Sequence, residues 1–241
     1  MSESGTDLVS YDVRDGVAWA RISNGKANAL SFDVLGGLDR CLTLAEEEAS
    51  VGALVITRTP GFLTGGFDLT VMQGDDPAAM IRLVSDGGAL FTRLFASSVP
   101  VVVAASGHAV AAGALMLLAA DERIGADGSF KVGLIETQIG MFLPRWAIEL
   151  AEERLSRRHF QVATVGARMY PPADALDAGY LDAVVAPEEL EATAQAAAEA
   201  WAALPAAAYA AQVRVIRGAR IAALEAAVAA DRAAGAGPIV D

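Results

Sequence analysis

Hydrophobic and polar residues alternate in two short segments near the N-terminus. The segments LVSYDV (8–13) and VAWARI (17–22) are separated by the break RDG, a pattern typical of a hairpin of half-buried strands. From Ser31, a residue type that caps helices, phenylalanine and leucine recur at helical spacing up to the acidic AEEE. The chain is therefore expected to open with two strands and a helix.

Two later segments are almost entirely apolar. VGALVIT (51–57) and VPVVVAAS (99–106) are rich in β-branched residues, which predicts strands buried on both faces. A helical pattern over about 78–96 separates them. Strand, helix and strand in this order indicate an α/β fold.

Beyond Pro144 the pattern changes to short helices. They break at YPP (170–172) and lead into a strand-like segment, LDAVVA (181–186). The residues from 187 to about 233 form an Ala-rich helical region that Pro205 divides. Such a region would expose apolar faces if it stood alone, so we expect it to pack on the chain's own core or on another subunit.

Composition narrows the class of protein. The 241 residues are 54% hydrophobic, enough for one large domain or one domain with a small helical appendix. The formal charge of −12 argues against a nucleic acid or an anionic membrane as the main partner. With no unbroken spanning segment and no signal-peptide pattern, a cytoplasmic protein is expected. A single cysteine, Cys41, excludes an internal disulfide, and with two histidines no metal cluster is expected.

Glycine-bearing turns follow both apolar segments. They are GFLTGGFDL (61–69) and GHAVAAGALMLLAAD (107–121). Small residues let a ligand approach the backbone, and the helix that starts in the second turn offers unpaired N–H groups. Two such turns at the ends of neighbouring strands can direct two N–H groups at one developing oxyanion. Ordinary connecting loops are the alternative, and neither turn matches a phosphate-loop or dinucleotide fingerprint.

One carboxylate lies in a segment that is otherwise unable to exchange protons near neutral pH. GLIETQIGM carries Glu136 among leucine, isoleucine and methionine, surroundings that raise the pKa of a carboxyl group as a general base near pH 7 requires. A solvated loop acid is the alternative. His108 is a weaker candidate for a base, and Asp68 and Asp121 are interpreted as caps or turn formers.

Five segments resemble, in chain order, the enoyl-CoA hydratase/isomerase (crotonase) superfamily. They are similar to its segment for the adenine and pantetheine end of coenzyme A, its two oxyanion motifs, its catalytic-acid segment and the stretch before its trimerising helices. In that order they are GKANALS (25–31), FLTGGFDLTVM (62–72), PVVVAASGHAVAAGALMLLAADERIGAD (100–127), FKVGLIETQIGMFLP (130–144) and PPADALDAGYLDAVV (171–185). Each is modestly specific, but five in the correct order form a specific match.

The resemblance implies a fold and an assembly. We expect the α/β crotonase (ClpP-like) spiral of ββα units over residues 1–185 and a C-terminal helical trimerisation region over 186–241. A homotrimer or hexamer is implied. The implied small-molecule partner is an acyl-CoA, with no cofactor beyond this substrate, no metal, no nucleic acid and no membrane.

The resemblance also assigns roles to single residues. Glu136 corresponds to the catalytic acid, and the backbone N–H groups of Phe67 and Ala112 correspond to the oxyanion hole. The expected acyl pocket consists of Leu115, Met141 and Phe142. The expected CoA-binding residues are Lys26, Ala27, Asn28, Ala29, Gly65 and Gly66.

One departure from the family's hydratases decides the expected reaction. Hydratases carry two glutamates, and Leu115 stands at the first of these two positions. A missing acid removes a contribution of about 10²- to 10⁴-fold to hydration. One carboxylate is enough to move a double bond from carbon 3 to carbon 2 of an acyl-CoA, so a 3,2-enoyl-CoA isomerase of unsaturated fatty-acid oxidation is expected.

Two alternatives stay open. The first is an enoyl-CoA hydratase or another single-acid reaction of the crotonase fold, and the second is a non-enzymatic acyl-CoA binding subunit. The second alternative draws on the scarcity of lysine, since only Lys26 and Lys131 are present. Arg217 or Arg220 is a candidate to contact the CoA phosphates in place of a C-terminal lysine.

Overall fold

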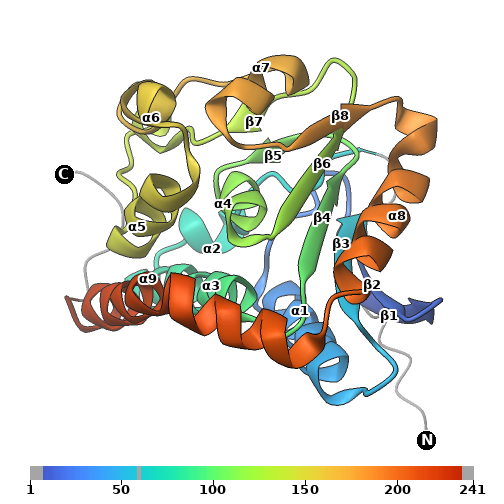
Figure 1. Ribbon diagram of the computed structural model, residues 1–241. Helices are drawn as coiled ribbons and strands as arrows, with labels where there is room; N and C mark the ends of the chain where they lie inside the picture. The colour runs from blue at the N-terminus through green and yellow to red at the C-terminus, as the bar shows by residue number, and fades with distance from the viewer. Residues whose placement is uncertain (1–7, 59–60, 235–241) are drawn as a thin grey trace, which may run out of the picture.

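The computed structural model describes residues 8–58 and 61–234. A twisted sheet runs through the centre, and helices pack against it from both sides (Figure 1). The main sheet has the strand order β1-β2-β3-β4-β6-β8, and β5 pairs with β7 in a second sheet. The strands are β1 Val9–Arg14, β2 Val17–Ile22, β3 Ala53–Arg58, β4 Val101–Ala105, β5 Ala109–Val110, β6 Glu122–Ala126, β7 Val132–Gly133 and β8 Ala183–Val185.

The first two strands form the predicted hairpin. β1 and β2 pair antiparallel, with Arg14 opposite Val17. The turn residues Asp15 and Gly16 both have positive φ, 50° and 76°, as the favoured two-residue hairpin turn requires. All later neighbours in the main sheet run parallel. Every residue of β4 is buried, so helices cover both faces of this strand, as its apolar sequence predicted.

The helices are α1 Phe32–Glu47, α2 Leu69–Met72, α3 Pro77–Ala96, α4 Ala112–Ala119, α5 Arg145–Arg154, α6 Arg157–Thr164, α7 Pro172–Ala178, α8 Leu190–Ala202 and α9 Ala206–Ala234, with 3₁₀ turns η1 Glu136–Ile139 and η2 Pro187–Glu189. The predicted cap of α1 is confirmed, because the Ser31 side chain accepts a hydrogen bond from Val34 N. The strand–helix–strand order of β3, α3 and β4 is confirmed as well.

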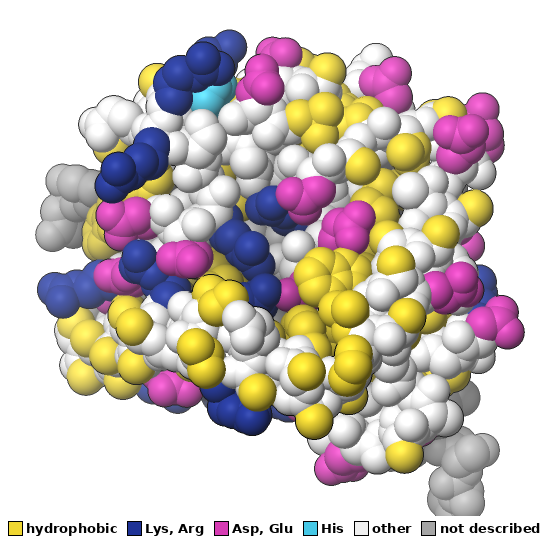
Figure 2. Space-filling view, in the orientation of Figure 1, with side chains coloured by type: hydrophobic (Ala, Val, Ile, Leu, Met, Phe, Trp, Pro, Cys, Tyr) yellow, Lys and Arg dark blue, Asp and Glu magenta, His cyan; other side chains and the backbone are white. Residues whose placement is uncertain are grey.

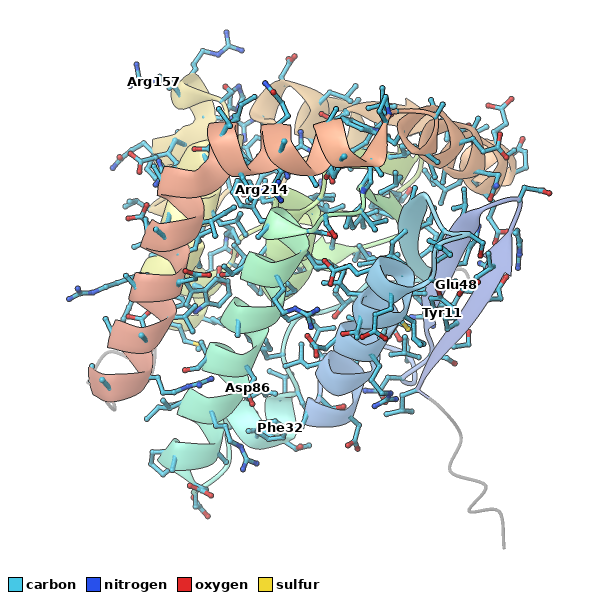
Figure 3. The ribbon with its side chains drawn as sticks, turned by 60° about the horizontal axis from the view of Figure 1, so that its bottom comes forward. Tyr11, Phe32, Glu48, Asp86, Arg157 and Arg214 are labelled. Carbon is cyan, nitrogen blue, oxygen red and sulfur yellow. The ribbon has the colours of Figure 1, made fainter. Side chains whose placement is uncertain are left out.

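The C-terminal helices pack on the chain's own core. Pro205 separates α8 from α9, as expected. α8 lies on the sheet, where the Trp19 indole donates a 2.8 Å hydrogen bond to Gln195. α9 runs alongside α3, with α1 on the other side of α3 (Figure 3). The division at residue 185 stays a prediction, and residues 235–241 of the expected trimerisation region lie outside the described residues.

Asp121 anchors α9, which corrects its interpretation as a cap or turn former. Its side chain is fully buried and pairs with Arg217 of α9. It also accepts hydrogen bonds from Val101 N at 2.8 Å and from the Tyr209 hydroxyl at 3.0 Å. The carboxylate thus joins β4 to α9. Asp68 is a cap, as predicted, and accepts from Thr70 N at the start of α2.

Ion pairs account for much of the surface charge. Figure 2 shows acidic and basic side chains interspersed over the face that α8 and α9 border. The buried Arg123 donates to both carboxylate oxygens of the exposed Asp182, at 2.7 and 2.6 Å. Among residues 8–58 and 61–234, no helix combines the length and the apolarity needed to cross a bilayer. The same ranges contain no cluster of His, Cys, Asp and Glu arranged to hold a metal ion.

Candidate active site

The two glycine-bearing turns, residues 61–69 (the first turn) and 107–113 (the second turn), lie side by side beyond the carboxyl ends of β3 and β4. Thr64 of the first turn donates from its N–H to the carbonyl of His108, at 3.2 Å. Val110 of the second turn donates back to the Thr64 carbonyl, at 3.1 Å. Gly113 permits this approach, because a β-carbon there would lie 2.7 Å from the Thr64 carbonyl oxygen. The glycine in the first turn of α4 is therefore required by packing.

The two expected oxyanion amides are free. Within the described residues, neither Phe67 N nor Ala112 N donates a hydrogen bond to a backbone or side-chain acceptor. The first turn passes close to the start of α4, since a β-carbon on Gly66 would lie 3.7 Å from Ala112 N. α4 has no side-chain cap, so its first amides keep their capacity to bind a negatively charged oxygen.

A cavity of about 410 Å³ opens beside these turns. Its lining joins the first turn, α2 and the η1 segment: Gly65, Gly66, Phe67, Leu69, Met72, Gln73, Ala111, Ile135, Glu136, Ile139, Gly140 and Met141. Apart from Glu136, none of these side chains carries a group that titrates near neutral pH. The cavity therefore places a single acid among apolar groups, next to a turn with a free amide.

Glu136 is held in an environment that favours its protonated form. The residue is 9% exposed, and its Oε2 is sealed from solvent with no hydrogen-bond partner in the described residues. Burial raises the pKa of this carboxyl group to about 7, and the backbone amides of Glu136 and Ile135 oppose the rise in part. The group can therefore both accept and return a proton near neutral pH.

The expected acyl-pocket residues fall in different places. Met141 lines the cavity. Leu115 is only 2% exposed and belongs to the core under α4, and Phe142 is 45% exposed; neither lines the cavity. Ile135 and Ile139 provide apolar lining in their place. Both lie in the same motif as Glu136, but their orientation depends on the 3₁₀ turn η1, which the sequence pattern did not predict.

The segment 25–31 lies against the first turn. Gly65 N donates to the Ala27 carbonyl at 2.8 Å. Asn28 is fully buried; its side-chain amide donates to the Leu63 carbonyl at 2.6 Å and its side-chain oxygen accepts from Asn24 N at 2.8 Å. The Asn28 side chain, expected to bind CoA, is therefore committed to holding the two loops together.

Both lysines of the chain lie on or next to the loops 25–31 and 61–66. We call the surface formed by Lys26, Arg58, Phe62, His108 and Lys131 the basic rim. The Arg58 guanidinium donates to the carbonyls of Phe62, at 2.9 Å, and Lys26, at 3.3 Å. The His108 ring stacks on Phe62 at 4.4 Å and accepts from Lys131 N at 3.2 Å. Burial and the nearby Lys131 charge lower the pKa of His108, which lies outside the lining of the Glu136 cavity.

The two candidate C-terminal arginines are already paired. Arg217 binds Asp121 and donates to the Phe95 carbonyl. Arg220 binds Glu149 and Glu153. Both guanidinium groups therefore serve to attach α9 to the core, and a contact of either one with the CoA phosphates stays a prediction. No sequence pattern indicated that Arg58 belongs to the basic rim, because its position there depends on the path of the turn after β3.

Comparison with known proteins identifies the family. A family model described as enoyl-CoA hydratase/isomerase matches residues 12–235. Human mitochondrial enoyl-CoA delta isomerase 1 is 34% identical over 200 residues, which cover 82% of this chain and 66% of that protein. The chain thus spans about two thirds of the length of this relative.

Solved structures of two proteins extend the similarity to the fold. An enoyl-CoA hydratase/isomerase family protein from Pseudomonas syringae superimposes with a TM-score of 0.91 at 41% identity, covering 95% of this chain and 98% of the other. A Mycobacterium tuberculosis protein, called an enoyl-CoA isomerase in one structure and a probable enoyl-CoA hydratase in another, gives TM-scores of 0.89 and 0.90 at 34% identity, covering 95% of this chain and 99% and 96% of the other. The sheet order and the C-terminal helices described above are thus those of the crotonase fold. The chain belongs to the enoyl-CoA hydratase/isomerase family.

Proposed function

We propose that the protein is a 3,2-enoyl-CoA isomerase that acts on unsaturated fatty acyl-CoA. The observation that carries this proposal is the lone carboxyl group of Glu136 in a cavity that also contains Phe67 of the oxyanion turn. A hydratase of this family uses two acids, and the cavity lining offers one. Relatives that bear the name enoyl-CoA delta isomerase support the same choice.

The proposed reaction needs one base and no water. The Glu136 carboxylate takes a proton from carbon 2 of the bound thioester, and the electron pair of that bond moves onto the thioester oxygen. The amides of Phe67 and Ala112 bind the resulting enolate oxygen, and loss of one such donor typically costs about 10²- to 10³-fold in rate. Glu136 then returns the proton to carbon 4, which leaves the double bond between carbons 2 and 3.

The apolar lining assists this proton transfer. The isoleucines at 135 and 139 and Met141 line the same cavity as the carboxyl group, and an apolar site excludes the water that would otherwise compete for the enolate. Because the substrate itself supplies and receives the proton, the reaction requires no cofactor and no metal.

The basic rim supports an acyl-CoA as the substrate. The protein carries a formal charge of −12, yet both of its lysines lie on this rim. Neither Lys26 nor Lys131 forms an ion pair with a described carboxylate. Exposed unpaired cations beside the first turn can bind the CoA phosphates while the thioester reaches the amides.

The C-terminal helix supports an oligomer. Val215 and Ile216 of α9 are 79% and 67% exposed in the single chain. Adjacent apolar side chains on one helix are more typical of an interface than of a solvated surface. A homotrimer, alone or paired into a hexamer, accounts for them and fits the family. A cytoplasmic location stays a prediction, and the human relative is described as mitochondrial.

The test compares two substrates. Purified protein is given 3-enoyl-CoA and, separately, 2-enoyl-CoA, and the formation of conjugated thioester is compared with hydration. An isomerase converts the first substrate and leaves the second unhydrated, and Glu136→Gln abolishes the conversion. Hydration that survives Glu136→Gln would favour a hydratase with another base. Acyl-CoA binding without either activity would favour a binding subunit.

A further inference from the structure

α3 carries two consecutive glycines in its interior. Gly87 and Gly88 lie near the middle of this helix, and both are buried. Glycine weakens a helix relative to alanine, because it loses more backbone freedom on folding. Two glycines in succession at buried positions therefore call for a reason in the packing of α3.

Each of the two glycines makes room for one aromatic ring. A β-carbon on Gly87 would lie 2.4 Å from both Cε1 and Cζ of Phe67. A β-carbon on Gly88 would lie 2.8 Å from Cε2 and Nε1 of Trp146, a residue of α5 that does not line the cavity. Carbon atoms pack at about 3.5–4.0 Å, so neither β-carbon fits. The outer edge of the Phe67 ring thus fills the space that a side chain at position 87 would need.

The backbone of Phe67 is held separately by Leu30. Leu30 N donates to the Gly66 carbonyl at 2.9 Å, and Asp68 N donates to the Leu30 carbonyl at 3.2 Å, which makes a parallel bridge between Leu30 and Phe67. Successive peptide groups of an extended chain point in opposite directions. Since the groups on either side of Phe67 face Leu30, the Phe67 N–H points away from Leu30, and it has no acceptor in the described residues.

The Phe67 amide is therefore fixed through two different parts of the same residue. The bridge to Leu30 sets the direction of the peptide groups, and the ring on α3 prevents this short bridge from tilting. The helix α2, which begins two residues after Phe67, also lies against α3 (Figure 1). The whole first turn thus depends on how closely it can approach this helix.

We propose that Gly87 is a positioning residue for the oxyanion hole, because it admits the Phe67 ring onto α3 and thereby keeps the Phe67 amide directed at the thioester oxygen. Gly87 acts through Phe67 and does not line the cavity. The effect on catalysis rests on the proposed function, whereas the effect on the bound thioester oxygen requires only that acyl-CoA binds.

An alanine at position 87 has a predictable effect on the reaction. The Phe67 ring has to retreat by about 1 Å to reach ordinary contact distance, and a misplacement of this size costs up to about 10²-fold in rate. The amide lies nearer to the Leu30 bridge than the edge of the ring does, so it moves less. We expect kcat of Gly87→Ala to fall about tenfold and KM to stay within about twofold, because ground-state binding is retained.

The direct test is the infrared band of the thioester carbonyl in bound hexanoyl-CoA that carries ¹³C at carbon 1. Hydrogen bonds from the two amides lower the frequency of this band relative to free hexanoyl-CoA. In Gly87→Ala we expect the band to return part of the way toward its free value. Gly88→Ala is the matched control and should leave the band at its wild-type position, because its β-carbon meets Trp146 instead of Phe67.

A second substitution separates positioning from a general loss of stability. Phe67→Leu removes the ring atoms Cε1 and Cζ that a β-carbon at position 87 would meet, and it leaves a gap on α3. In the double variant Gly87→Ala/Phe67→Leu the alanine methyl group fills this gap. Its carbonyl band and its kcat should therefore lie closer to wild type than those of either single variant. If Gly87→Ala does not fold, the comparison of the double variant with Phe67→Leu carries the test.

The outcomes distinguish this proposal from the proposed function. An unchanged carbonyl band in folded Gly87→Ala would overturn the role of Gly87, even with a raised KM, since the ring would then have moved without the amide. An equal shift in Gly88→Ala, or a double variant no closer to wild type than Phe67→Leu, would overturn it as well. The expected shifts in a protein without isomerase activity would retain the role of Gly87 and reject the proposed function. Failure to bind hexanoyl-CoA would overturn both.

Discussion

Ala111 packs against Gly66. A β-carbon added to Gly66 would lie only 3.2 Å from the β-carbon of Ala111. Ala111 adopts φ 52° and ψ −118°, a backbone conformation that glycine adopts readily and residues with a side chain do not. Its N–H donates to the Gly133 carbonyl at 3.0 Å, which ties the turn to β7. A strained residue thus holds the wall of the oxyanion turn in place.

We predict that Ala111→Gly stabilises the protein. Release of about 1–3 kcal/mol of strain outweighs the roughly 0.4–1 kcal/mol by which glycine favours the unfolded chain. The net gain should be about 1 kcal/mol, measured as the free energy of unfolding in urea. Ala114→Gly, within α4 and in ordinary helical conformation, is the control and should destabilise. Equal destabilisation by both substitutions would show that Ala111 is not strained.

The raised pKa of Glu136 predicts a pH-dependent stability. The folded protein binds this proton with a pKa of about 7, compared with an ordinary value of 4.5. Stability from this group is complete below the ordinary value and is lost as the pH rises toward 7, because the unfolded chain releases the proton first. The loss is on the order of 3 kcal/mol. Glu136→Gln should therefore gain in stability relative to wild type between pH 5 and pH 8, and parallel curves would contradict the assignment.

Substitution at position 115 tests whether Leu115 belongs to the core or to the acyl pocket. Since Leu115 is 2% exposed and packs in the core, Leu115→Glu buries a carboxyl group with no partner, at a cost of several kcal/mol. We expect a large fall in melting temperature and no gain in hydration of 2-enoyl-CoA. Leu115→Met, which conserves volume, should cost less than about 1.5 kcal/mol. A stable Leu115→Glu variant with hydratase activity would show that this side chain reaches the substrate.

The basic rim predicts which kinetic constant changes. Because Lys26 and Lys131 lie away from the reacting carbons, their replacement by Gln should raise KM for acyl-CoA several-fold, roughly the effect of one exposed ion pair each, and leave kcat unchanged. The rise should weaken as salt is added. Arg157→Gln on α6, an exposed cation outside the residues of the basic rim, is the control; Figure 3 labels its side chain. A fall in kcat with constant KM would place these lysines elsewhere in the mechanism.

Local patterns were sufficient to predict much of the fold. Patterns among residues close together in the sequence predicted the β1–β2 hairpin, the Ser31 cap and the buried strands β3 and β4. β6 was missed because its sequence, ERIGA, begins with two charged residues. Those charges are satisfied by distant partners, Trp201 for Glu122 and Asp182 for Arg123. No local pattern contains that information.

The site was predictable only in part for the same reason. Glu136 could be selected because its neighbours in sequence are apolar. The role of Asn28 in joining two loops depends on a hydrogen bond to Leu63, 35 residues away. Such long-range pairs require the three-dimensional structure.

The central claim is that one buried carboxyl group carries the proton from carbon 2 to carbon 4. The most direct measurement uses 3-enoyl-CoA labelled with deuterium at carbon 2 and locates the label in the first product formed in ordinary water. A lone, sealed acid predicts deuterium at carbon 4 in a measurable fraction of the product. Product in which the label is lost completely to solvent, or an unchanged rate in Glu136→Gln, would contradict the account.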